Sequence, residues 1–143
     1  MTPARPTPQP RAGVYRFPSR APLPAALEAG NARVIRIATG NVRDKPAFLK
    51  ETALALQFPA HFGQNWDAFY DCLTDLAEQA AKPLVIVFED LSGFARVEPE
   101  EFGAAVDALT DAVEYWEEQG KRLIALVGVD ETVLAPELPE LSV

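Results

Sequence analysis

The chain has 143 residues, of which 48% are hydrophobic, so it is long enough for one domain with a buried core. None of its apolar runs approaches the roughly 18 residues that a membrane-spanning helix needs. Arginines near the N-terminus are not followed by the apolar stretch of a secretory signal. The single cysteine, Cys72, cannot form an intramolecular disulfide, and a reducing, cytoplasmic location is therefore expected.

Charge is distributed unevenly along the chain, whose formal net charge is −8. Residues 1–36 contain six arginines against Glu28 alone, whereas residues 37–143 contain seven basic and 20 acidic groups. Nucleic acid binding requires clustered Lys and Arg that neutralise phosphates, so the acidic part argues against a nucleic acid ligand. It favours a basic protein partner, which it would attract. Solubility alone would also explain an acidic surface, so charge by itself leaves both interpretations open.

The N-terminal residues differ from the rest in composition. Residues 1–24 carry seven of the 13 prolines, and they are predicted to form a Pro/Arg-rich segment that is largely extended or disordered. Residues 25–143 are predicted to form a single domain. Residues 13–17 alternate enough to lie along the domain surface as an edge strand, and residues 25–29 are compatible with one helical turn. The Pro-bearing residues 131–143 are expected to be loose.

From residue 33 onward, strand-like and helix-like patterns alternate. A continuous apolar run is typical of a strand buried on both faces, and apolar residues three and four apart indicate a helix with one buried face. The predicted elements are a strand at residues 33–38, helices capped by Asp44 and Asn65, a strand at 84–88, a helix from Pro99 to just before Gly120, and a strand at 123–129. This β-α-α-β-α-β order predicts an α/β fold with a small three-stranded parallel sheet covered by helices.

The helix predicted from Asn65 to about Gln79 has two chemically different faces. Its apolar stripe, expected to face the core, contains Trp66, Phe69, Leu73, Leu76 and Ala80. The opposite stripe contains Asp67, Asp71, Thr74, Asp75 and Glu78, with Tyr70 at the boundary. Like charges at i and i+4 weaken a helix by roughly 0.2–0.5 kcal/mol per pair. An uncompensated acidic face therefore suggests a surface that receives positive charge, and Tyr70 beside it is typical of an interface anchor.

The sequence offers few candidate residues for a catalytic or metal site. His61 and Cys72 are the only histidine and the only cysteine, too few for a metal site of that kind, and no metal or cofactor is expected. Cys72 is interpreted as a packed, inert thiol and His61 as a contact residue in a loop. Asp67 and Asp71 would suit a small carboxylate-dependent hydrolase, but successive turns of one exposed helix do not form a pocket. The acidic helix end with Glu114, Glu117 and Glu118 is interpreted as a solvated face rather than a second contact patch.

The segment HFGQNWDAFYDCLT, at residues 61–74, resembles the barstar family, the intracellular protein inhibitors of barnase-type ribonucleases. The resembling residues are His61, Phe62, Gly63, Asn65, Asp67, Ala68, Tyr70, Asp71, Cys72, Leu73 and Thr74. The order of elements matches over roughly residues 33–129, so the resemblance covers most of the chain and implies the same architecture. His61 stands where the family has a tyrosine, and Asp75-Leu76 stands where better-known members have Gly-Trp.

The resemblance implies an immunity or antitoxin protein that blocks the active site of a ribonuclease with its acidic helix and is not an enzyme. The implied partner is a basic, barnase-like ribonuclease or a related toxin, with neither nucleic acid nor membrane as a partner. Asp71 is expected to enter the phosphate position of the enzyme, and Asp67 to be the second acidic contact. The implied partner-binding residues are His61, Gly63, Asn65, Asp67, Tyr70, Asp71, Thr74 and Asp75. An interaction module of the same fold that binds another basic protein is the alternative.

Overall fold

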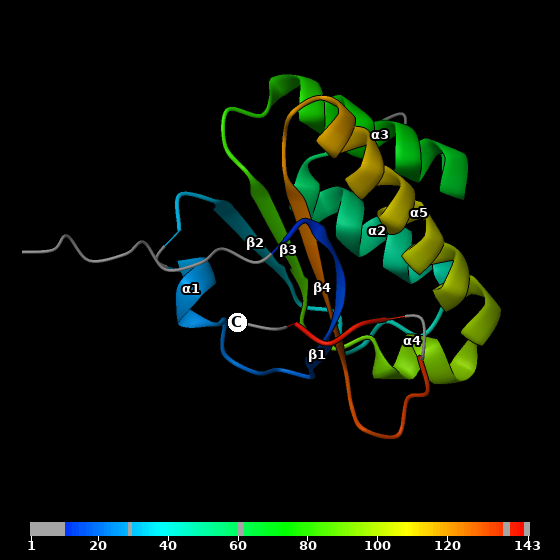
Figure 1. The fold of residues 1–143 in the computed structure, drawn as a ribbon. Helices are drawn as coiled ribbons and strands as arrows, with labels where there is room; N and C mark the ends of the chain where they lie inside the picture. Colours follow the sequence, from blue (N-terminus) through cyan, green and yellow to red (C-terminus); the bar gives the residue numbers. More distant parts are fainter. Residues whose placement is uncertain (1–10, 29, 60–61, 136–137, 142–143) are drawn as a thin grey trace, which may run out of the picture.

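The computed structural model describes residues 11–28, 30–59, 62–135 and 138–141. Its centre is a four-stranded sheet with parallel neighbours, in the order β1-β4-β3-β2 (Figure 1). The strands are β1 (Gly13–Pro18), β2 (Arg33–Ile37), β3 (Leu84–Phe88) and β4 (Leu123–Val129). The helices are α1 (Ala25–Glu28), α2 (Lys45–Leu56), α3 (Trp66–Gln79), α4 (Ser92–Val97) and α5 (Pro99–Glu118). The predicted α/β class and parallel sheet are confirmed.

The predicted number of strands is wrong, because the sheet has four strands rather than three. The additional strand, β1, is the edge strand expected at residues 13–17, and it runs parallel to β4, with Gly13 opposite Ile124 and Pro18 opposite Val129. A proline is tolerated at the end of β1 because this strand lies at the edge of the sheet. Since Val14 and Phe17 are buried, β1 packs with the sheet although it precedes residue 25. The exact N-terminal limit of the domain remains a prediction.

Two short helices also fall outside the predicted element order. α1 is the single turn for which residues 25–29 are suited. α4 directly precedes α5 and was not predicted at all. It has only six residues, and Leu91 at its N-cap position provides no side-chain hydrogen bond. A helix that is this short and uncapped leaves almost no periodic signal in the sequence.

The ends of the long helices lie where the sequence predicts them. The side chain of Asp44 accepts a hydrogen bond from the Ala47 amide at 2.9 Å. Asn65 accepts one from the Ala68 amide at 2.8 Å, which satisfies an otherwise unpaired donor in the first turn of α3. Gly120 follows α5 with a φ of 72°, the left-handed conformation that glycine adopts without strain.

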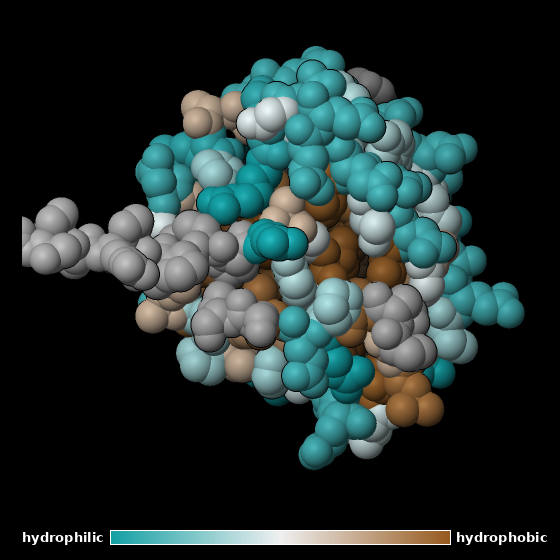
Figure 2. Space-filling view, viewed as in Figure 1, coloured by the Kyte–Doolittle hydropathy of each residue, from teal (hydrophilic) through white to brown (hydrophobic). Residues whose placement is uncertain are grey.

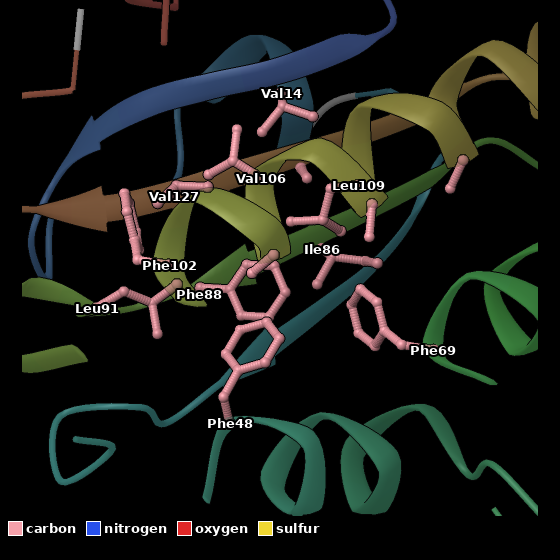
Figure 3. Packing of buried hydrophobic residues seen from close by; sticks show 14 of the residues in the cluster. Val14, Phe48, Phe69, Ile86, Phe88, Leu91, Phe102, Val106, Leu109 and Val127 are labelled. Carbon is pink, nitrogen blue, oxygen red and sulfur yellow. The ribbon is translucent and has the colours of Figure 1, made fainter. Parts of the chain in front are cut away.

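Buried side chains form one cluster on each face of the sheet. The larger cluster joins α2, α3, α4 and α5 to the sheet, and Figure 3 shows Phe48 and Phe69 pointing toward Ile86 and Phe88 of β3. Phe48 stacks on Phe88 with ring centroids 5.4 Å apart. The smaller cluster, on the opposite face, consists of Phe17, Leu27, Val85, Val87, Ile124 and Leu126. Both faces of β3 and β4 are therefore covered, which explains why these strands read as continuous apolar runs.

The described part of the C-terminal tail is packed, so its expected looseness is corrected. Val133, Ala135 and Leu138 are buried. Arg16 on β1 donates hydrogen bonds to the carbonyl oxygens of Val133 at 2.7 Å and Asp130 at 2.8 Å. These bonds tie the tail to a strand more than a hundred residues earlier, and no local sequence pattern announces such a partner.

Candidate functional site

The helix α3 carries most of the predicted contact residues, and its orientation is set by the residues that it buries. Phe69, Leu73 and Ala77 are buried against the core. Trp66, Leu76 and Ala80, which were expected on the same stripe, are only half-buried. The buried stripe of α3 is therefore narrower than predicted and runs through Phe69, Leu73 and Ala77. The opposite, acidic face is exposed to solvent, as predicted.

Two tryptophan hydrogen bonds help to fix α3 in place. The buried Trp116 of α5 donates from Nε1 to the carbonyl oxygen of Leu73 at 3.0 Å. Trp66 donates from Nε1 to Glu101 Oε2 at 2.8 Å, and the Lys45 ammonium lies 5.4 Å from the centre of its ring. Buried hydrogen bonds with a single available partner specify one arrangement of two helices. The outer face of α3 is therefore presented by a helix that is held at both its first turn and its middle.

Acidic side chains line the outer face of α3. Asp67, Asp71, Asp75 and Glu78 are all exposed. None of these four carboxylates forms an ion pair with any residue that the structure describes. In Figure 2 the surface over α3 and α5 is mainly hydrophilic, and apolar residues are seen chiefly in the middle of this face of the molecule. A row of unpaired carboxylates on a rigid helix can bind a cationic surface without first breaking internal salt bridges.

Tyr70 shows that the acidic surface continues from α3 onto α5. Burial raises the pKa of the Tyr70 phenol, and the negative charges of Asp111 and Glu118 on α5 raise it further, with smaller contributions from Tyr115 and Asp71. The sequence did not single out Asp111, because periodicity does not reveal which helix packs beside α3. The negative charge of Glu118 raises the pKa of Tyr70, whereas burial and the negative charge of Glu117 raise the pKa of Tyr15 on β1.

Cys72 lies beside the acidic face and is half-buried. Burial raises the pKa of its thiol, and the neighbouring carboxylates of Asp75 and Asp71 raise it further. A raised pKa lowers the fraction of reactive thiolate at neutral pH. This environment agrees with the predicted inert thiol.

The loop before α3 supplies the remaining predicted residues. Gly63 and Asn65 are exposed, and a Cβ added to Gly63 would lie 3.3 Å from Asn65 Nδ2, so this turn is closely packed. Thr74 is half-buried, and its hydroxyl donates to the carbonyl oxygen of Asp71 at 2.8 Å. His61 lies outside the described residues. Seven of the eight predicted residues thus lie on α3 or within three residues of its start.

Within the described part of the chain, no group of three or more His, Cys, Asp or Glu side chains is arranged to hold a metal ion. No helix among the described residues is long and apolar enough to cross a bilayer.

Comparison with known proteins supports the family resemblance. A sequence model of the family described as "Barstar (barnase inhibitor)" matches residues 32–128. Comparison with curated protein sequences gave no match. The matched region contains β2, β3, α2, α3, α4 and α5 in full, and all of β4 except its final residue, Val129. Both β1 and α1 precede the match. Because the match covers more than half of the 143 residues, the chain belongs to the barstar family of barnase inhibitors.

Proposed function

We propose that this protein inhibits a barnase-type ribonuclease by covering the active site of the enzyme with the outer face of α3. The observation that carries this proposal is the row of exposed carboxylates at Asp67, Asp71 and Asp75, which have no ion-pair partner among the described residues. A ribonuclease binds the phosphates of RNA with cationic side chains. Carboxylates presented at similar spacing can occupy the same cationic site.

The chemistry of inhibition is binding alone. Carboxylate oxygens accept charge-assisted hydrogen bonds, and an arginine can donate two of them at once to one carboxylate. Asp71 lies in the middle of the row and is proposed to take the phosphate position, with Asp67 as the second acidic contact. Asp67, Asp71 and Asp75 lie on successive turns of α3, so all three can face one partner.

The remaining contacts are assigned to the edges of this face. Tyr70 offers an aromatic ring with a polar tip, which is a common anchor in protein interfaces. Gly63, Asn65, Thr74 and the loop residue His61 are proposed to complete the contact. Asp111 and Glu118, which act on Tyr70 from α5, extend the acidic surface and broaden the area that a basic enzyme would meet.

The direct test measures inhibition of a barnase-type ribonuclease with an RNA substrate. Asp71→Ala is expected to weaken binding by more than about 2 kcal/mol, the general threshold for an interface hot spot; the barnase–barstar complex is itself one of the cases behind that general range. The fold should persist, because Asp71 is exposed. Unchanged inhibition by a folded Asp71→Ala protein would refute its assignment.

Glu28→Ala is the matched control. Glu28 is an exposed carboxylate at the end of α1, and α1 packs on the opposite face of the sheet (Figure 1). Both substitutions remove one negative charge, so a loss of inhibition caused by net charge alone would appear in both variants. Binding of the ribonuclease without inhibition would favour the alternative, an interaction module that has kept this fold. RNA hydrolysis by the protein alone that Asp67→Asn abolishes would favour the hydrolase.

A further inference from the structure

The amino-terminal edge of the sheet gathers basic residues in an otherwise acidic domain. Each of the four strands begins with a basic residue or follows one within two positions. These residues are Arg11 before β1, Arg33 in β2, Lys82 before β3, and Lys121 and Arg122 before β4. Since neighbouring strands lie about 4.8 Å apart, a parallel sheet brings its four strand starts to one edge. Figure 1 shows the chain entering β3 and β4 at the same end of the sheet.

Two adjoining hollows lie at this edge. The larger has a volume of about 690 Å³ and is lined by Arg11, Lys82, Lys121 and Arg122 around a floor of small apolar residues, Ala12, Ala80, Ala81 and Pro83. The smaller, of about 210 Å³, shares Ala80, Ala81 and Lys82 with the first and adds Arg33. The larger volume lies within the range of about 300–1,000 Å³ that is usual for small-molecule sites.

The negative ends of two helices neutralise only part of this positive charge. The C-termini of α3 and α5 are near this edge, and each carries about half a negative charge. Lys121 donates from Nζ to the carbonyl oxygen of Ala77 near the end of α3. The end of α5 is capped by the backbone that follows it, since the Lys121 amide donates to the carbonyl oxygen of Trp116 at 2.8 Å.

Positive charge exceeds negative charge at the two hollows even without Arg122, which takes part in another interaction. Arg11, Lys82 and Lys121 supply three positive charges around the larger hollow, and Arg33 in the adjoining smaller hollow supplies a fourth. Glu117 is the one carboxylate among the described residues that line the two hollows, and together with the two helix ends it offsets about two of these charges. An excess of about one positive charge remains at the larger hollow, or about two with Arg33, and this excess attracts the dianion of a phosphate monoester.

The position of Arg11 is also defined. The hydroxyl of Tyr15 donates to the carbonyl oxygen of Arg11 at 2.7 Å, which holds residue 11 beside β1. Neither Arg11 nor Lys82 forms an ion pair with a described residue. Both side chains are therefore available to an anion that enters the hollow.

We propose that the hollow at the amino-terminal edge of the sheet, lined by Arg11, Lys82, Lys121 and Arg122, binds a small organic phosphate monoester. The cationic rim would hold the phosphate, and the alanine and proline floor would contact the organic group. This site is separate from the ribonuclease-binding face, because the hollow begins after the last turn of α3 whereas Asp67 lies in its first turn.

Calorimetric titration of the full chain at low ionic strength tests the proposal, with adenosine monophosphate (AMP) as the probe. AMP is expected to bind, and adenosine, which lacks the phosphate, is not. Cyclic AMP carries one negative charge fewer and should bind at least threefold more weakly than AMP. No measurable binding of AMP, or equal binding of AMP and adenosine, would overturn the proposal.

Substitutions identify the residues responsible. Lys82→Gln and Arg11→Gln should each weaken AMP binding at least threefold, and both positions are exposed, so the fold should be retained. Lys50→Gln is the matched control, since Lys50 is an exposed lysine on α2 that lines neither hollow. An equal loss in the control would indicate nonspecific attraction and overturn the site. Binding of a short single-stranded RNA without binding of AMP would assign the basic residues to nucleic acid instead.

Discussion

Three long helices, α2, α3 and α5, cover one face of the sheet, whereas the other face is covered mainly by α1, which has only four residues, and by flanking segments (Figure 1). The helix-covered face includes Phe48, Phe69 and Trp116 among its fully buried side chains. On the thinly covered face, the buried cluster formed by described residues has six members. The proposed binding surface lies over the thick layer and is remote from the thin one.

The two layers also differ in how they relate to the family. The thick layer lies within residues 32–128, the part that matches the family model. On the thin side, the sheet residues Val85, Val87, Ile124 and Leu126 lie within that match, but Phe17 on β1 and Leu27 on α1, which belong to the same buried cluster, precede it. Mutations should therefore be able to change ribonuclease binding and the covering of the thin side of the sheet separately.

Removing β1 should have the largest effect. Deletion of residues 1–17 removes the buried Val14 and Phe17, each worth about 1.5–3 kcal/mol of burial. The free energy of unfolding, measured by urea denaturation, is expected to fall by about 3–6 kcal/mol.

Deletion of residues 1–12 is the control for that truncation. It leaves β1 intact, and we expect thermal stability and ribonuclease binding to be unchanged. Unfolding or loss of ribonuclease binding after the shorter deletion would move the limit of the domain or of the interface into residues 1–12.

A pair of buried leucines compares the two layers directly. Leu27 on α1 and Leu73 on α3 are 1% and 0% exposed, so the same atoms are lost from equally buried sites. Leu73→Ala should cost about 4–5 kcal/mol, because the packed helices cannot close the cavity, and Leu27→Ala about 2 kcal/mol, because a single turn can relax. Equal losses in denaturation experiments would show that the thin layer is as rigid as the thick one.

Charge on the thick side should control the rate of association with a ribonuclease. Asp67→Asn is expected to lower the on-rate severalfold at low salt and to leave the off-rate less affected, because attraction between exposed charges accelerates encounter. The difference should shrink at high salt through screening. Stopped-flow measurements should find no such change for Glu28→Gln on the opposite layer, and a salt-independent on-rate would argue against an electrostatic mechanism.

The smallest effect concerns the thiol beside the acidic face. The Cys72 pKa is raised by burial and then by Asp75 and Asp71, so Asp75→Asn should lower this pKa modestly. Because only the thiolate reacts, alkylation by iodoacetamide at a fixed pH below the pKa should become faster, by less than about threefold. Mass spectrometry across a pH series measures the shift, and an unchanged profile would mean that burial alone sets the pKa.

The sequence predicted the elements whose signals are local. β3 and β4 were recognised because every residue in each strand is buried, which leaves an uninterrupted apolar run. The start of α3 was recognised because Asn65 is a standard capping residue. Its exposed acidic face followed from periodicity, because carboxylates on one side of a helix must turn away from the apolar side.

Features that depend on distant partners were predicted in part or missed. The alternation at residues 13–17 indicated an edge strand, but nothing near residue 13 specifies β4 as its partner, so this strand was not counted in the predicted sheet. Asp111 joins the acidic surface only because α5 packs against α3. The C-terminal tail is held by Arg16, whose partners Val133 and Asp130 lie at the other end of the chain.

The pairing of the first strand with the last also determines when the protein can finish folding. Gly13 pairs with Ile124, whereas β2 and β3 are much closer in sequence, and closing a long loop costs more entropy than closing a short one. During synthesis β1 emerges first but has no partner until β4 has emerged. α3 and α5 both precede β4, so the surface that they form can assemble before β1 docks. Completion of the sheet is therefore expected to be the slow, late step of folding.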